Sequence, residues 1–253
     1  MTGTRFTIST LVIQQISCGL IYSLLRGSKY NVHDKQGYKF FSFSNIFPYH
    51  DLIKGDRRNL FIASPNDDFI SYIKEQLEYL KNITVGAMNF KIEGCKKLTN
   101  NMSSTPIGLI TGTPILCNIR RYKFEEALNL ANIDGHAATY WKSNHPINLF
   151  LNQVQANLIK KYNIYNDLPI DTNKPKNEEY EKSIFYLPRF RRQLAIPLAM
   201  GQGRYNPIMV GSYWSFGITD LELAKFALDV GLGELNSMGF GFMNIDRKRM
   251  WLN

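Results

Sequence analysis

The 253-residue sequence contains few of the features that mark secreted, disulfide-linked or membrane-spanning proteins. It has only three cysteines, Cys18, Cys95 and Cys117, and their odd number and wide spacing argue against a disulfide framework and a CxxC metal knuckle. The longest apolar run, residues 11–25, is interrupted by glutamine and serine, which indicates an amphipathic helix and not a membrane span. Because no signal-peptide pattern opens the chain, we expect a cytoplasmic protein without a membrane partner.

Acidic residues are in the minority, with 21 of them against 30 basic residues and a net charge of +9. This excess favours a polyanionic partner such as nucleic acid, and an acidic membrane surface would also satisfy it. The sequence has no His, Asp or Glu cluster at metal-ligand spacing, so we expect neither a metal nor another cofactor. The hydrophobic content of 44% is enough to bury one large core or two small ones.

The first hundred residues alternate between the residue patterns of strands and helices. Strands are expected at residues 5–13, 39–47, 59–63 and 83–97, and helices at 15–25 and 65–80. Asp67 and Asp68 are expected to cap the second helix. The order is βαββαβ, which is that of a ferredoxin-like domain.

The second half follows the same order less regularly. Strands are expected at residues 105–119, 193–200, 207–216 and 238–245, and helices at 148–162 and 219–230. The run Gly201-Gln202-Gly203-Arg204-Tyr205 predicts a hairpin between the two middle strands. We therefore expect an α+β protein with two tandem ferredoxin-like domains, residues 1–100 and 101–253.

Four glycines, Gly231, Gly233, Gly239 and Gly241, lie between the last expected helix and the last expected strand. A run of glycines can adopt positive φ and expose several backbone N–H groups to a phosphate. An ordinary helix C-cap followed by a bulge would explain the same spacing. A dinucleotide-binding loop is excluded, because these glycines follow a helix instead of opening one.

The run GLGELNSMGFG, together with the layout of residues 19–47, resembles the repeat-RNA processing endoribonucleases of the repeat-associated RNA-binding superfamily found in CRISPR systems. The resemblance implies two ferredoxin-like domains, in agreement with the expected order of elements. It also implies cleavage of precursor CRISPR RNA within the repeat. This chain departs from the family at Glu234 and Leu235, where a basic residue is common.

By position, the resemblance implies that Tyr22, His33 and Lys39 are catalytic, with the candidate active site in residues 1–100. In a cleavage by the adjacent 2′-hydroxyl, imidazole can move protons near neutral pH, Lys39 can offset developing negative charge, and Tyr22 can hydrogen-bond. A solvated surface position is the alternative interpretation of His33. His50 is a weaker candidate.

Basic residues recur along the chain, and most such runs are solvated surfaces. The resemblance implies RNA contacts from Arg191, Arg192 and Arg204 of the expected hairpin, and from the four glycines of the loop. Phosphate contacts would make the affinity depend on salt. Phe190 and Tyr205 can stack on bases or belong to the core.

Three hypotheses follow. The first is a metal-independent endoribonuclease that leaves 2′,3′-cyclic phosphate and 5′-hydroxyl ends on CRISPR repeat RNA. The second is a non-catalytic RNA-binding subunit of a CRISPR effector complex. The third is a basic ferredoxin-like interaction module without a nucleic acid. Effector-complex subunits and a second copy of the chain are left open as further partners.

Overall fold

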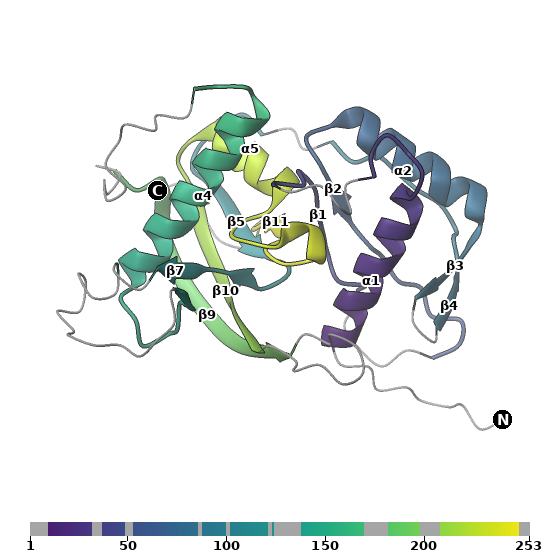
Figure 1. Ribbon diagram of the computed structural model, residues 1–253, viewed down its shortest axis with the longest axis horizontal. Helices are drawn as coiled ribbons and strands as arrows, with labels where there is room; N and C mark the ends of the chain where they lie inside the picture. The colour runs from purple at the N-terminus through teal and green to yellow at the C-terminus, as the bar shows by residue number, and fades with distance from the viewer. Residues whose placement is uncertain are drawn as a thin grey trace.

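The computed structural model describes residues 10–31, 37–48, 53–85, 88–99, 102–120, 123, 138–169, 182–197 and 208–247. Within these ranges the protein combines helices with antiparallel sheets in two halves that lie side by side (Figure 1). The expected α+β class is confirmed. No helix in the described ranges has the length and apolar character needed to cross a membrane.

The described part of the first half has two helices and two small sheets. Its elements are α1 (Thr10–Leu25), β1 (Ser42–Phe43), β2 (Ile62–Ala63), α2 (Asp67–Leu80), β3 (Asn82–Val85) and β4 (Met88–Lys91). β1 pairs with β2, and β3 pairs with β4. Their core consists of apolar side chains from both helices and from the strand region, namely Leu20, Ile21, Leu24, Leu25, Phe41, Phe43, Ile46, Phe69 and Ile73.

Three expectations for this half were wrong in detail. Residues 10–13 belong to α1 instead of a strand, because a short apolar run fits either element and tertiary packing decides between them. Of the strand expected at 39–47, only β1 is regular, with an isolated bridge between Phe47 and Asn59. The strand expected at 83–97 is instead the hairpin β3–β4, whose strands pair with each other.

The second half is built on one antiparallel sheet. Its strands are β5 (Ile107–Thr111), β6 (Ile115–Leu116), β9 (Phe185–Pro197), β10 (Ile208–Ile218) and β11 (Met243–Ile245). In the described part of this half, the helices α4 (Ile147–Tyr165) and α5 (Leu221–Val230) connect them, and a separate hairpin is formed by β7 (Asn118–Arg120) and β8 (Ala138–Tyr140). The sheet order is β11-β5-β10-β9, so the first strand lies between the last and the third. This is a βαββαβ unit, and the expected ferredoxin-like fold is confirmed.

The helices cover one face of this sheet. Trp214 of β10 is fully buried and stacks on Phe150 of α4, with ring centroids 4.4 Å apart. The indole N–H of Trp214 donates to Ser212 Oγ at 2.9 Å, so its polar atom is satisfied inside the core. From α5, Ala224 and Ala227 join the same cluster. Burial of these large rings contributes to the stability of the second half.

Two features of the second half differ from expectation. β9 begins at Phe185, eight residues before the expected start at 193, because it pairs with β10 along nearly its whole length. The strand expected at 105–119 is interrupted at Gly112 and Thr113, whose backbone N–H groups both donate to Phe242 O. The chain therefore leaves β5 there and returns as β6 to pair with β10.

Side chains from the first half pack directly against the second. Phe40 lies between Tyr165 and Phe226, with ring centroids at 5.1 and 6.4 Å. Ser42 Oγ donates to the backbone carbonyl of Asp229 at 3.1 Å. The segment before β1 is thereby fixed to α4 and α5. The boundary expected between residues 100 and 101 stays a prediction.

The carboxyl group of Asp229 lies at this junction and carries an electrostatic cost. Burial, with a smaller contribution from Asp67, raises its pKa from 3.8 to about 6. The native state therefore binds this proton more tightly than the unfolded chain, and this group lowers stability as pH rises between these two values. We expect Asp229→Asn to raise Tm by about 3 °C at pH 8, after allowance for solvent screening.

The gain in Tm should shrink below pH 6 and vanish well below pH 3.8, where the wild-type group is protonated in both the folded and the unfolded state. Thermal unfolding followed by circular dichroism across this pH range would measure it. Glu222→Gln, at an exposed position of the same helix, is the matched control and should show no such pH-dependent gain. An equal effect of both substitutions at every pH would contradict the assignment.

Candidate active site

The structure brings together two of the three residues expected to be catalytic. Lys39 Nζ lies 5.2 Å from the centroid of the Tyr22 ring, a cation–π distance. Tyr22 follows the fully buried Ile21 on α1, so it lies at the border of the buried face, and its ring also meets Phe41 edge-on. An ammonium and a phenol separated by 17 positions in the sequence thus share one site.

The third residue, His33, lies outside the described residues, and so do His50 and Arg204. Their expected roles stay predictions. The described segment before His33 is held by packing. Its Tyr30 ring lies 5.6 Å from the Phe69 ring and 5.3 Å from the Tyr72 ring, and these contacts tie the segment to α2.

The glycine-rich loop, residues 231–241, is folded around its own hydrogen bonds. The N–H groups of Gly231, Gly239 and Gly241 donate to Ala227 O, Asn236 O and Pro114 O, respectively. All four glycines of the run are buried. These amide groups therefore hold the loop in shape, and contact of the glycines with RNA stays a prediction.

Close backbone packing explains why glycine is needed in this loop. A Cβ atom on Gly241 would lie 1.9 Å from Leu232 O, and one on Gly233 would lie 2.3 Å from Leu116 O. Both residues also have positive φ, +64° and +72°. Of the alternative interpretation, a helix C-cap followed by a bulge, the C-cap is present at Gly231, which ends α5, but it does not account for the close packing at Gly233 and Gly241.

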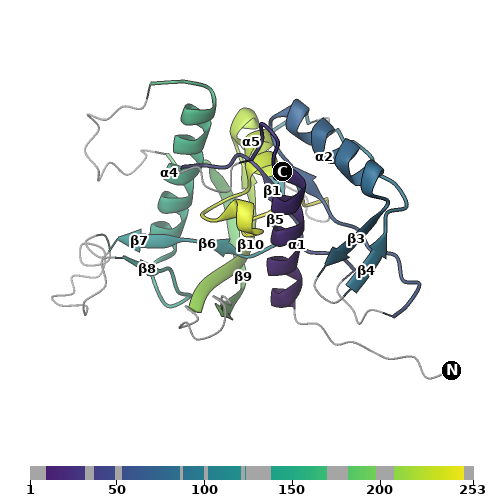
Figure 2. The same cartoon turned by 45° about the vertical axis from the view of Figure 1, so that its right-hand side comes forward.

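The loop lies beside the Tyr22 site. Its short 3-10 helix η1 (Asn236–Met238) lies against α1 (Figure 2). Cys18 Sγ of α1 donates to Ser237 O at 3.7 Å. Cys18 is one helical turn before Tyr22. Burial raises the pKa of Cys18 to about 11, with Lys39 opposing the shift, so the thiol stays neutral and is no nucleophile.

The structure also shows a buried cation that sequence reasoning missed. Lys161 of α4 is 3% exposed, and its Nζ donates to Gly231 O, Gly233 O and Asn236 Oδ1 of the loop. Burial lowers its pKa to about 7, and Glu234 opposes the shift. The helical spacing could have indicated its burial, because Lys161 lies three positions after Leu158 and so falls on the apolar face of α4.

The arginines of β9 are exposed basic groups that a ligand can reach. Arg189, Arg191 and Arg192 are all exposed. A register shift opposite Tyr213 leaves Arg191 without a partner position on β10, and such a bulge changes the direction of neighbouring side chains. The Arg192 guanidinium lies 4.4 Å from the Tyr213 ring centroid, so the strand holds it in place.

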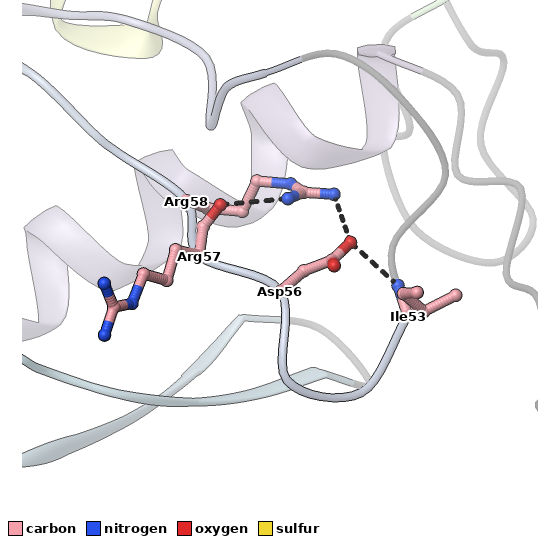
Figure 3. Close-up of polar contacts among 4 residues, drawn as sticks. All are labelled: Ile53, Asp56, Arg57 and Arg58. Atoms are coloured by element: carbon pink, nitrogen blue, oxygen red, sulfur yellow. Dashed lines mark hydrogen bonds and ion pairs between the residues drawn. The ribbon is translucent and has the colours of Figure 1, made fainter.

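The two arginines that precede β2, Arg57 and Arg58, are paired with acidic side chains of the protein. The Arg58 side chain is only 4% exposed and donates to Asp56 Oδ2 and to Arg57 O, while the same carboxylate oxygen accepts from Ile53 N (Figure 3). Arg57 is exposed and pairs with Glu93 at 3.1 Å. Arg58 therefore stabilises a turn, and the arginines of β9 are the better candidates for phosphate contact.

Comparison with known proteins identifies the family. Residues 98–245 match the model of the family described as "CRISPR associated protein Cas6, C-terminal". The chain belongs to this family. The resemblance inferred from the glycine-rich run and residues 19–47 is thereby confirmed.

Two curated relatives and one solved structure extend the match over nearly the whole chain. The chain is 31% identical to "CRISPR-associated endoribonuclease Cas6" of Haloferax mediterranei, covering 91% of this chain and 86% of the relative. It is 29% identical to "CRISPR-associated endoribonuclease Cas6 2" of Methanocaldococcus jannaschii, with 89% of each covered. A structure described as "CRISPR associated protein Cas6" superposes with a TM-score of 0.65 at 22% identity, covering 97% of this chain and 96% of that one.

Proposed function

We propose that this protein is an endoribonuclease that cuts precursor CRISPR RNA within the repeat. Family membership and two relatives named as Cas6 endoribonucleases support the activity. The single structural observation that carries it is the meeting of Lys39 and Tyr22 beside the glycine-rich loop. Its place of action in this proposal is the cytoplasm, and its partner is the repeat RNA.

The chemistry proposed is a transesterification without a metal ion. The 2′-hydroxyl next to the scissile phosphate attacks phosphorus and loses its proton, and the bond to the 5′-oxygen breaks. The products are a 2′,3′-cyclic phosphate and a 5′-hydroxyl end, so the atoms balance without added water. His33 moves a proton in this step, since imidazole titrates near neutral pH.

Lys39 and Tyr22 have complementary roles in this proposal. The Lys39 ammonium offsets the negative charge that develops on the non-bridging phosphate oxygens. Tyr22 positions that ammonium through its ring, and its hydroxyl can hydrogen-bond to the phosphate. The positive charge of a lysine thereby supplies what a metal ion supplies in other nucleases.

Binding of the RNA is assigned to the exposed face of β9. Arg191 and Arg192, with Arg204 of the connection to β10, neutralise phosphates in this proposal. Phe190 is 36% exposed, but its ring packs on Trp141 and Trp214 at 5.8 and 5.3 Å, which favours a role in the core. Affinity for repeat RNA should therefore depend on salt through the arginines.

The decisive experiment incubates the purified protein with repeat RNA in excess EDTA. We expect one cut within the repeat, with a cyclic phosphate on one product and a 5′-hydroxyl on the other, as read by mass spectrometry. A repeat carrying a single 2′-deoxy residue before the scissile phosphate is the matched control and should bind without being cut. Cleavage of the deoxy substrate would contradict attack by the 2′-hydroxyl.

Other outcomes decide between the alternatives. Salt-dependent binding without any cleavage, with or without magnesium, would favour a non-catalytic subunit that holds guide RNA in an effector complex. Cleavage that appears only with a divalent ion would overturn the metal-independent chemistry but retain the endoribonuclease. Absence of RNA binding would leave only a protein-interaction module.

A further inference from the structure

Lys161 makes a complete set of hydrogen bonds inside the protein. Its ammonium has three N–H donors, and they find Gly231 O at 3.3 Å, Gly233 O at 2.7 Å and Asn236 Oδ1 at 2.5 Å. A charge buried to this degree is costly unless it is fully hydrogen-bonded. The number of acceptors matches the number of donors, so Lys161 is held in one position.

Asn236 extends this contact to the other side of the loop. While its Oδ1 accepts from Lys161, its Nδ2 donates to Leu232 O and to Phe240 O, both at 3.0 Å. One amide thus connects the first and the last part of the loop. Gly231 and Gly241 leave room for it, because a Cβ on either residue would come within 2.8 Å of Asn236 Nδ2.

Lys161 also contacts the segment that carries Lys39. Its Nζ lies 5.9 Å from the centroid of the Tyr38 ring, and Tyr38 directly precedes Lys39. On the other side, η1 of the loop contacts α1 through Ser237 O and Cys18. The Lys161 ammonium therefore contacts both the glycine-rich loop and the segment with Tyr38, and these two segments border the Tyr22 site.

We propose that Lys161 is a positioning residue for RNA cleavage, which fixes the glycine-rich loop and residues 37–41 so that Lys39 meets Tyr22. This inference rests on the proposed function. Lys161 is buried and acts through other groups, without touching RNA. Glu234, which accepts from Asn118 Nδ2 at 3.1 Å, is the acidic residue of the loop that favours the charged form of Lys161.

The test compares Lys161→Met with Lys160→Met. Methionine keeps the length and apolar stem of the side chain but removes the donors, and Lys160 is the exposed neighbour on the same helix. We expect Lys161→Met to lower the single-turnover cleavage rate at saturating repeat RNA by about 100-fold. Its Kd for the 2′-deoxy repeat should stay within about threefold of wild type, and Lys160→Met should match wild type in both.

Hydrogen exchange provides a second readout that does not depend on activity. In Lys161→Met, amides of residues 231–241 and 37–41 should exchange faster, while those of β10 keep their protection. Tyr38→Leu removes the ring that Lys161 meets, together with its contact to Phe40, and leaves the hydrogen bonds of Lys161 to the loop in place. It should slow cleavage about 10-fold and speed exchange in that segment but not in the loop. Tyr38→Leu also decides the question if Lys161→Met fails to fold.

Each remaining outcome is informative. A folded Lys161→Met that cuts as fast as Lys160→Met would overturn the inference, and so would an equal loss of binding and cleavage. Failure of the wild-type protein to cut repeat RNA would instead overturn the proposed function. In that case, unchanged exchange in both segments of Lys161→Met would also show that the lysine does not hold them.

Discussion

Replacing His33 with alanine is expected to slow cleavage of repeat RNA by about 100- to 10,000-fold, the range of a lost proton-transfer group. Binding should change little, because the proposed function assigns the phosphate contacts to the exposed arginines of β9. The physical reason is that Lys39 and Tyr22 can stabilise and orient the phosphate, whereas the proposed proton transfer is assigned to the imidazole of His33. Single-turnover rates in EDTA and Kd for the 2′-deoxy repeat measure the two effects separately.

The matched control for this prediction is His145→Ala. His145 Nδ1 accepts from the backbone N–H of Lys142 at 3.0 Å in the turn before α4, far along the chain from the site. This substitution should leave the cleavage rate near that of wild type. Equal rates for wild type and His33→Ala would show that another group moves the proton, and His50 would be the next residue to replace.

The largest expected effect on stability is that of Gly241→Ala. The new Cβ would lie 1.9 Å from Leu232 O, a backbone atom that cannot move alone, and φ is +64°. Overpacking and an unfavourable φ together should lower the free energy of unfolding by about 3 kcal/mol or more. Urea unfolding followed by tryptophan fluorescence would measure the loss. Cleavage should also decline, because the loop borders the candidate site.

Gly94→Ala is the control for this substitution. Nothing lies within 4 Å of a Cβ at Gly94, and its φ is outside the left-handed region. Alanine there should change the free energy of unfolding by less than about 1 kcal/mol. If Gly241→Ala unfolded at the same urea concentration as Gly94→Ala, the close approach of the two backbone segments would not be required.

The local sequence pattern was sufficient to predict the type and approximate bounds of an element where that element is long and amphipathic. The helix expected at residues 148–162 is α4, Ile147–Tyr165, and that expected at 219–230 is α5, Leu221–Val230. Asp220 caps α5, with its Oδ1 accepting from Leu223 N at 2.9 Å. In the first half, a short apolar run left strand and helix undecided, so residues 10–13 were assigned wrongly. Residues 83–97 were expected as one strand, but they include parts of two strands, β3 and β4, that pair with each other.

Local pattern was less informative about caps and the role of single residues. Asn66, and not Asp67 or Asp68, caps α2, with its Oδ1 accepting from Phe69 N at 3.0 Å. Asp67 pairs instead with Lys97 at 2.9 Å, a partner thirty positions away. An N-cap depends on one backbone angle at one residue, which the type of residue alone does not determine.

Sequence alone was enough to predict the α+β class, the order of elements in the second half, the family and the residues Tyr22 and Lys39 as candidates. These follow from periodicity and from motifs, which are local properties of the chain. Only the tertiary structure decided that Lys39 lies over Tyr22 and that Lys161 is buried against the glycine-rich loop. Lys161 and Gly233 are 72 positions apart, and such contacts arise from the packing of α4 on α5 and not from local preference.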